Sequence, residues 1–297
     1  MKIIVTGSNG FVAGSVLAQA PDSWEIHGIA RTEGNTPEPG VTYHFFDLLD
    51  HEKLRSLLYE IIPDAVIHTA ALANIDFCET NQQLAEDVNV AVTAVLADAC
   101  QKIGAKLVFC STDTVFEGEK GNYSETDKPQ GVNFYADTKI KAERIVITAS
   151  QKNAVARLSL VMGLPVIGKG NSFLGDMIQK LRNGEQMNFP QNEIRTPVDV
   201  ITLGAALLEL AQNEFTGIIH LAGSTRINRY EMALQIASEL NLPTGGIIPA
   251  NSNSITGRAP RPNDASMDNS LAKQILKTPM LSLSEGLAMT LNFKTEK

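Results

Sequence analysis

Short apolar runs alternate with longer segments of helical hydrophobic spacing along the first half of the chain. A short apolar run between turn residues is typical of a strand buried on both faces, whereas apolar residues at every third or fourth position predict a helix. This alternation is typical of an α/β fold, here a Rossmann-like, doubly wound parallel sheet. We predict strands at residues 2–6, 24–30, 41–46, 65–68, 106–110 and 154–160, and helices at 11–20, 51–61, about 83–103 and 134–147.

The hydrophobic pattern changes beyond about residue 163, where helical segments separated by polar loops predominate. The apolar run 218–221 is the exception, and we predict that it returns to the main sheet as a strand. The sequence therefore predicts a dinucleotide-binding domain at 1–162, to which 195–222 returns, and a small, mostly helical substrate-binding part at 163–297. The helices expected in the second half are 173–183, 199–212 and 228–240, followed by a polar loop at 251–262.

Composition and charge are those of a globular enzyme: 297 residues, 43% hydrophobic and 20% charged. The net charge of −8, without a Lys/Arg cluster, argues against a nucleic-acid partner. No apolar run reaches the about 20 residues that span a bilayer, and the apolar start of the chain is interrupted before a signal peptide could form. The three cysteines lack metal-ligand spacing, so we predict no metal site and a reducing, cytoplasmic location.

A glycine-rich segment, Gly7-Ser8-Asn9-Gly10, follows the first predicted strand and opens the first predicted helix. Glycines at such a turn let the backbone approach a pyrophosphate, and the free N–H groups of the helix N-terminus favour an anion. Alanine at position 13 replaces the usual third glycine and is small enough for close packing. A purely structural turn is the alternative. We expect dinucleotide contacts from Gly7, Asn9, Gly10, Phe11 and Val12.

The residue after the second predicted strand chooses between the two nicotinamide dinucleotides. An acidic residue at this position selects NAD, but the chain has Arg31, which favours the 2′-phosphate of NADP. A solvated loop arginine is the alternative reading. We therefore predict NADP(H) as the preferred cofactor, with NAD(H) as the alternative. Further cofactor contacts are expected from residues that follow the third and fourth strands, namely Asp47 and Leu48 at the adenine and Thr69, Ala70 and Ala71 at the sheet edge.

Tyr135 and Lys139 stand one helical turn apart in the predicted helix 134–147. Their side chains therefore project from the same face. A cation beside a phenol stabilises the phenolate and lowers the tyrosine pKa from its reference of about 10. Tyr135 is thus a candidate proton donor to a carbonyl oxygen near neutral pH. An ordinary surface pair would show the same spacing. The glycine-rich segment at the other end of the domain is what favours the catalytic interpretation of Tyr135 and Lys139.

Taken together and in order, these motifs resemble those of the extended short-chain dehydrogenase/reductases. The segments that carry the resemblance are 7–14, Asp47-Leu48, 68–71, Ser111-Thr112-Asp113 and the Tyr135/Lys139 pair. Within that superfamily the chain is most similar to the dTDP-4-dehydrorhamnose reductase group. The segments shared with this group are 111–118, Arg157-Leu158-Ser159, 195–200 and Arg261-Pro262.

The resemblance implies Thr112, Tyr135 and Lys139 as a catalytic trio. Thr112 would hydrogen-bond the substrate oxygen, Tyr135 would exchange its proton, and Lys139 would hold the nicotinamide ribose. Ser111 is the neighbouring hydroxyl, but on a strand it points to the opposite face. Asp113 would either contact the sugar or cap the following turn.

The family places a nucleotide sugar between the sheet and the C-terminal part, and the resemblance implies its contacts. An arginine suits a diphosphate because its planar fork binds two oxygens at once. Two departures from the group leave the sugar open, because Leu160 replaces an aromatic residue and Thr114 replaces a tyrosine. The implied substrate-binding residues are Asp113, Asn171, Ser172, Arg195 and Arg261, the last of which lies in the loop 258–264.

The resemblance implies an NAD(P)H-dependent reductase that transfers hydride to a nucleotide-linked 4-keto (deoxy)sugar while tyrosine donates the proton. An epimerase could use the same trio. The same group also includes proteins that resemble the regulatory subunit of methionine adenosyltransferase, which would bind NADP without catalysis. A homodimer through paired helices is common in the superfamily, but the apolar face of residues 85–99 fits core burial equally well.

Overall fold

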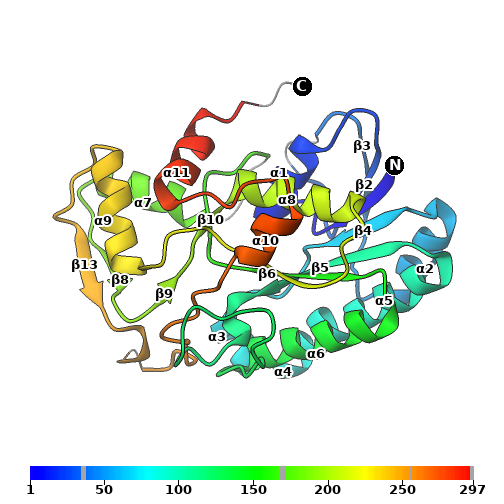
Figure 1. Cartoon of the computed structure of the whole chain (residues 1–297), viewed down its shortest axis with the longest axis horizontal. Helices are drawn as coiled ribbons and strands as arrows, with labels where there is room; N and C mark the ends of the chain where they lie inside the picture. Colours follow the sequence, from blue (N-terminus) through cyan, green and yellow to red (C-terminus); the bar gives the residue numbers. More distant parts are fainter. Residues whose placement is uncertain (35–37, 168–171, 255, 295–297) are drawn as a thin grey trace.

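A parallel sheet of seven strands forms the centre of the molecule (Figure 1). The computed structural model describes residues 1–34, 38–167, 172–254 and 256–294. The strands run in the order β11-β6-β5-β4-β1-β2-β3, and every neighbouring pair is parallel. The predicted fold class is therefore confirmed. Their bounds are β1 Lys2–Thr6, β2 Glu25–Ala30, β3 Val41–Phe45, β4 Ala65–His68, β5 Lys106–Thr112, β6 Ala154–Leu158 and β11 Gly217–Leu221.

Two layers of helices cover the sheet because its strands are apolar on both faces. Along β1, Ile3 and Val5 belong to the core cluster shared with α1 and α8, whereas Ile4 belongs to the cluster shared with α2, α5 and α6. Successive side chains of a strand point to opposite faces, so one apolar run supplies both clusters. The covering helices are α1 Phe11–Gln19 and α8 Val200–Gln212 on one face and α2 His51–Ile61, α5 Val92–Ile103 and α6 Phe134–Ala149 on the other.

The direction in which the chain adds successive strands to the sheet reverses between β1 and β4. From β1 the chain builds outward through β2 and β3, and then from β4 through β5, β6 and β11 on the other side. In open α/β sheets, ligands bind in the crevice at the carboxyl ends of the strands beside such a switch point. The turns that follow β1 and β4 begin with Gly7 and Thr69, so two predicted cofactor segments meet there.

The C-terminal part has its own apolar core, here called the cap cluster, which includes Leu174, Phe189, Ile236 and Leu287. It combines helices with three two-stranded sheets, so it contains more strand than the pattern predicted. The domain limits 1–162 and 163–297 remain a prediction. The elements are α7 Phe173–Arg182, α9 Arg229–Glu239, α11 Leu283–Asn292, β7 Val161–Met162, β8 Met187–Pro190, β9 Ile194–Arg195, β10 Val198–Asp199, β12 Ile227–Asn228 and β13 Ile247–Ala250.

Helix geometry departs from the prediction at 83–103. The helical segment is present and continuous, but within it α4 Gln82–Glu86 runs into a π-helical turn, η1 Asp87–Ala91, and then into α5. Strand β5 extends beyond residue 110 and ends at Thr112, so this side chain stands at the strand's carboxyl end. The remaining short elements are α3 Ile75–Thr80, α10 Ser270–Ile275, η2 Asp113–Val115 and η3 Ser252–Ser254.

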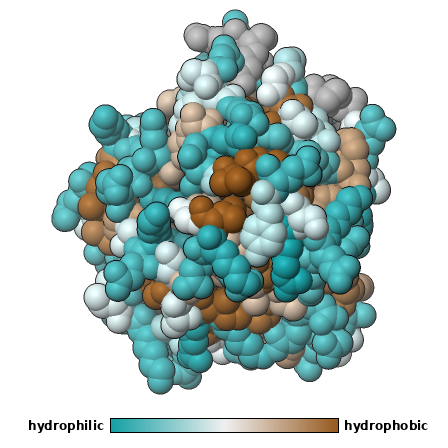
Figure 2. Space-filling model, turned by 90° about the vertical axis from the view of Figure 1, so that its right-hand side faces the viewer, coloured by the Kyte–Doolittle hydropathy of each residue, from teal (hydrophilic) through white to brown (hydrophobic). Residues whose placement is uncertain are grey.

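Two features of the described residues concern a membrane environment: the length and apolarity of the helices, and the polarity of the surface. No helix within the described residues combines the length and the apolarity needed to cross a membrane. The face seen in Figure 2 is mostly hydrophilic, and its apolar residues form small patches surrounded by polar ones.

Candidate active site

The glycine turn after β1 is shaped for close backbone approach. Gly7 has φ +69°, and a Cβ there would lie 3.0 Å from the Cα of Ala70. A Cβ on Gly10 would lie 2.9 Å from the Gly7 carbonyl oxygen, which accepts a hydrogen bond from the Gly10 amide at 2.7 Å. Among the described residues no side chain caps the N-terminus of α1, and its first turn has no acidic residue. Its N–H groups are therefore available to an anion.

The predicted adenosine contacts lie at the carboxyl ends of β2 and β3. The Asn9 amide donates to the carbonyl of Thr32 at 2.7 Å and so ties the glycine turn to the segment that carries Arg31. Arg31 is exposed directly after β2. Asp47 is also exposed, and its carboxylate accepts from the Leu49 amide at 3.0 Å. Both charged side chains therefore stand at the edge where a ribose and an adenine would lie.

The turn after β4 is held against the glycine turn by hydroxyl groups. Thr69 donates its hydroxyl to the Thr6 carbonyl at 2.7 Å, and the Ala70 amide donates to the Thr6 hydroxyl at 3.3 Å. Ala70 and Ala71 are half-buried. Small side chains at this position leave room for a dinucleotide to cross the sheet edge.

Thr112 and Tyr135 meet at the end of β5. Asn133 caps α6 by accepting from the Ala136 amide at 2.9 Å, which starts the helix so that Tyr135 lies in its first turn. The Thr112 hydroxyl lies near the Tyr135 phenol, close enough to oppose the rise in the pKa of Tyr135. Thr112 also lies 3.1 Å from the Thr114 hydroxyl and caps η2. The structure therefore brings together the two groups predicted to face a substrate oxygen.

Lys139 lies deeper than the sequence spacing suggested. Its Nζ donates to the Cys110 carbonyl at 2.7 Å and stands 4.0 Å from the centroid of the Phe109 ring. Burial lowers the pKa of Lys139 to about 8. Burial, and then the nearby Asp113 carboxylate, raise the pKa of Tyr135, which is opposite to the direction expected from Lys139 alone. The phenol loses the solvation of its charged form, and the spacing argument did not include that loss.

Asp113 is buried beside the trio and forms an ion pair with Arg195. The distance from Arg195 Nε to Asp113 Oδ2 is 3.4 Å. Burial raises the pKa of Asp113, against the opposing effect of Arg195. Thr112, not Asp113, caps the following turn. Ser111 donates to Glu143 at 2.6 Å inside the core, so its hydroxyl is engaged away from the site.

The other predicted substrate residues are engaged within the protein. Arg195 also donates to the Ile194 and Pro262 carbonyls, at 2.7 and 3.1 Å. Arg261 donates to the Ala259 carbonyl at 2.6 Å and to Asp76 at 2.9 Å. Ser172 caps α7 by accepting from the Gly175 amide. Asn171 lies outside the described residues.

Two further arginines line a cavity of about 210 Å³ in the C-terminal part, together with Phe173 and Phe189. Arg229 begins α9 and lies 3.6 Å from the buried carboxylate of Glu193, and Arg258 lies 3.4 Å from it. Burial lowers the pKa of Arg229, and Glu193 opposes that change. Sequence reasoning missed Arg229, whereas Arg258 stood in the loop 258–264 without a role. Only tertiary packing brings them together.

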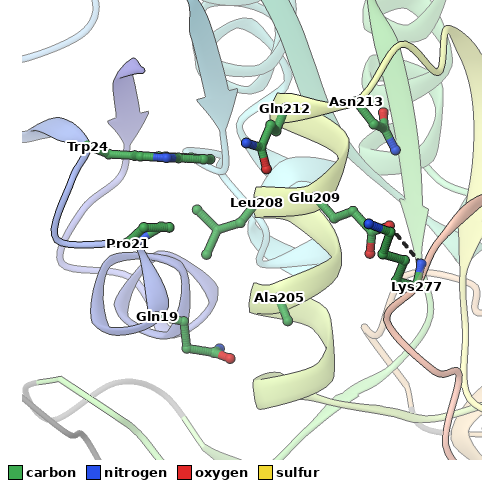
Figure 3. A pocket seen from close by; sticks show the side chains of 9 residues that line it. All are labelled: Gln19, Pro21, Trp24, Ala205, Leu208, Glu209, Gln212, Asn213 and Lys277. Atoms are coloured by element: carbon green, nitrogen blue, oxygen red, sulfur yellow. Dashed lines mark hydrogen bonds between the residues drawn. The ribbon is translucent and has the colours of Figure 1, made fainter.

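A larger pocket, of about 590 Å³, lies at the opposite edge of the sheet. Trp24 precedes β2 and Leu208 lies on α8, and the two side chains face each other across it (Figure 3). Glu209 on its wall accepts from the Lys277 amide at 2.7 Å. The pocket borders the amino ends of the strands, whereas Thr112 stands at a carboxyl end, so it is separate from the candidate site. The described residues contain no group of three or more His, Cys, Asp or Glu side chains arranged to hold a metal ion.

The switch-point glycine turn, the tyrosine–lysine helix and the parallel sheet define the class of protein: a member of the extended short-chain dehydrogenase/reductases, a superfamily that includes NAD(P)-dependent oxidoreductases. The family model of the RmlD substrate binding domain matches residues 1–295. The chain therefore belongs to that family, and the predicted resemblance is confirmed.

Relatives of known structure or name include both reductases and a subunit of methionine adenosyltransferase 2. The dTDP-4-dehydrorhamnose reductase of Mycobacterium tuberculosis is 26% identical over 98% of this chain and 92% of its own length. Methionine adenosyltransferase 2 subunit beta of Rattus norvegicus is 28% identical over 90% of this chain and 80% of its own. The crystal structure of the Bacillus anthracis dTDP-4-dehydrorhamnose reductase in complex with NADP superposes with a TM-score of 0.87, at 25% identity over 98% of each chain. The prediction of an NADP(H) cofactor is thus confirmed for the family.

Proposed function

We propose that this protein is an NADP(H)-dependent reductase of a nucleotide-linked 4-keto (deoxy)sugar. The observation that carries the proposal is the meeting of Thr112 and Tyr135 at the end of β5, beside the switch-point glycine turn. The similarity to the M. tuberculosis and B. anthracis dTDP-4-dehydrorhamnose reductases supports it.

The cofactor fits the glycine turn, and when bound it supplies the hydride. The uncapped N-terminus of α1 would hold the pyrophosphate, and Arg31 would hold the 2′-phosphate. Lys139, one turn beyond Tyr135, would reach the nicotinamide ribose. These residues bind and orient the dinucleotide along the carboxyl edge of the sheet.

Tyr135 serves as the proton donor. Its raised pKa keeps the phenol protonated at neutral pH, so it has a proton to give when hydride reaches the neighbouring carbonyl carbon. Thr112 hydrogen-bonds the same substrate oxygen and stabilises the charge that develops there. Tyr135 is buried and Thr112 is half-buried, which limits the access of water to the proton transfer.

The diphosphate of the substrate is assigned to Arg229 and Arg258. Both border the 210 Å³ cavity, and a bidentate guanidinium suits phosphate oxygens. All four arginines have a carboxylate partner, but the side chains of Arg229 and Arg258 are 26% and 22% exposed. Those of Arg195 and Arg261 are only 5% and 9% exposed, so they are less accessible to a ligand. Asp113, beside Thr112, would contact the sugar. Leu160 packs against the cap cluster, which agrees with the absence of an aromatic stacking surface at that position.

A second candidate function is that of an NADP-binding regulatory subunit. It is favoured by the similarity to methionine adenosyltransferase 2 subunit beta over most of both chains. In that case Tyr135 and Thr112 would have no substrate, and the protein would act by docking on a partner enzyme. An epimerase on the same trio, a homodimer and a cytoplasmic location remain further predictions.

The deciding experiment mixes the protein with NADPH or NADH and a panel of nucleotide-linked 4-keto-6-deoxy sugars, and follows loss of the reduced cofactor's near-ultraviolet absorbance. Tyr135→Phe, which keeps the ring and removes the proton donor, is the matched control. Turnover that disappears in the variant supports the reductase and names the sugar and the cofactor. Binding of NADPH without turnover of any sugar favours the regulatory subunit instead. Copurification with a partner enzyme then tests that function.

A further inference from the structure

A continuous line of buried polar side chains runs beneath the cofactor edge and joins the glycine turn to the tyrosine helix. Each of its members is at most 1% exposed. A buried polar group that lacked a partner would destabilise the fold, so such a line persists only where every member is satisfied. Its members, here called the polar bridge, are Thr6, His68, Thr93, Asn89 and Thr138.

The first half of the polar bridge links β1 to η1. The Thr6 hydroxyl, which accepts from the Ala70 amide, lies 2.7 Å from His68 Nδ1. His68 Nε2 lies 3.2 Å from the Thr93 hydroxyl. The Thr93 hydroxyl donates to the Asn89 carbonyl at 2.7 Å.

The donor and the acceptor of each hydrogen bond in this half of the polar bridge can be assigned. Because Thr93 gives its only hydroxyl proton to Asn89, it must accept from His68, so His68 Nε2 carries a proton. Burial, and then the Lys139 charge, lower the pKa of His68 to about 3, which keeps the ring neutral. Nδ1 therefore accepts, and the Thr6 hydroxyl donates to it. One histidine tautomer satisfies the whole line.

The second half of the polar bridge reaches the catalytic residues. The Asn89 amide donates to the Thr138 hydroxyl at 3.0 Å and to the Leu72 carbonyl at 3.2 Å, and its oxygen accepts from the Leu72 amide at 2.8 Å. Thr138 donates to the Tyr135 carbonyl at 2.7 Å. The π turn Asp87–Ala91 contains Asn89, which contacts both the loop after β4 and α6. π turns of this kind often occur at functional sites.

We propose that the polar bridge is a positioning device, with Thr93 and His68 as its central residues, that sets the loop after β4 relative to the tyrosine helix. Through Thr6 and Asn89 it holds both ends of the segment Ala70–Leu72, on which the nicotinamide half of the cofactor would rest. Through Thr138 it holds the helical turn that carries Tyr135. The inference rests on the proposed function for its effect on turnover, whereas its effect on cofactor binding is independent of any substrate.

Thr93→Val tests the bridge because it removes one hydroxyl and keeps the side-chain shape. Thr290→Val is the matched control, since the Thr290 hydroxyl is equally buried but has no hydrogen-bond partner among the described residues. Direct titration of NADPH fluorescence should show Thr93→Val binding on the order of fivefold more weakly, and Thr290→Val unchanged. With turnover, kcat should fall and the KM for NADPH rise, while the KM for the nucleotide sugar stays constant. Unchanged NADPH affinity in Thr93→Val, or equal weakening in both variants, overturns the proposal.

The assignment of donors and acceptors in the polar bridge can be tested separately, through the tautomer of His68. Nitrogen NMR of the histidine side chains, with His68→Asn to assign the signal, should show a neutral ring protonated at Nε2 at pH 7. A ring protonated at Nδ1, or an imidazolium, contradicts the assignment. If NADPH binding responds to Thr93→Val while no sugar is turned over, the reductase fails and the bridge stands. If a sugar is turned over while NADPH binding does not respond to Thr93→Val, the bridge fails and the reductase stands.

Discussion

At the scale of single residues, the proposed reductase depends on a phenol that keeps its proton. Tyr135 is 8% exposed. The nearby Asp113 carboxylate raises the pKa of Tyr135, and the Thr112 hydroxyl lowers it. The Tyr135/Lys139 spacing alone predicted the opposite direction for the tyrosine pKa. It could not predict burial or Asp113, because both arise from packing of β5 against α6. A raised pKa suits reduction, in which the tyrosine must arrive protonated.

Asp113→Asn should move the alkaline limb of the pH–kcat profile to lower pH, on the order of one unit. The Asp113 charge raises the pKa of Tyr135, so its removal lets the phenol ionise earlier and lose its proton-donor form. Steady-state rates of reduction across pH measure the limb. Ser159→Ala is the control, since it removes a hydrogen bond to Asp113, at 3.5 Å, without changing the charge. A limb that stays in place in Asp113→Asn would rule out this electrostatic role.

At the scale of elements, Gly10 at the end of the glycine turn and Gly14 inside α1 differ in their tolerance of a side chain. A methyl group on Gly10 would meet the Gly7 carbonyl oxygen at 2.9 Å, whereas one on Gly14 would meet Ile167 at an ordinary 3.5 Å. Gly10→Ala should therefore weaken NADPH binding by on the order of tenfold or more, because the turn must shift at the pyrophosphate position. Gly14→Ala should bind normally. Fluorescence titration of both variants checks this, and equal affinities would refute the steric account.

The accuracy of element prediction followed the strength of the local signals. The bounds of β1, α2 and β4 agree with the sequence. Gly7 marks the end of β1, Asp50 caps the start of α2, and β4 is a short apolar run between polar residues. The π turn escaped prediction, because a single π turn inside an α-helix has no sequence signature of its own. Arg229 escaped for a different reason: its partner Glu193 and its neighbour Arg258 come from distant segments, and no local pattern links them.

At the scale of the whole molecule, buried histidines connect stability to pH. His220 is fully buried, lies 3.2 Å from the Asp268 carbonyl and faces Arg157. Burial, and then Arg157, lower its pKa from 6.5 to about 3. The folded state therefore holds the neutral ring. The stability that this contributes is complete above pH 6.5 and declines as the pH falls from 6.5 toward 3.

His220→Asn should flatten the dependence of the unfolding free energy on pH, because asparagine keeps a donor for Asp268 but cannot take up a proton. Between pH 7 and pH 5 the histidine should cost the wild type ~2 kcal/mol. Urea unfolding at the two pH values measures the slope, which does not depend on whether the variant is less stable overall. The same slope in both proteins would show that His220 does not govern acid sensitivity.

The path of the chain between sheet and cap cluster limits how the site can open. After β6 the chain enters the C-terminal part, returns through α8 and β11, leaves again to form α9, and comes back to pack α10 against β11 before ending in α11. Several covalent crossings cannot all act as one hinge. Product release should therefore proceed by small sliding movements of packed elements, as in shear motions, rather than by a wide swing of one body away from the other.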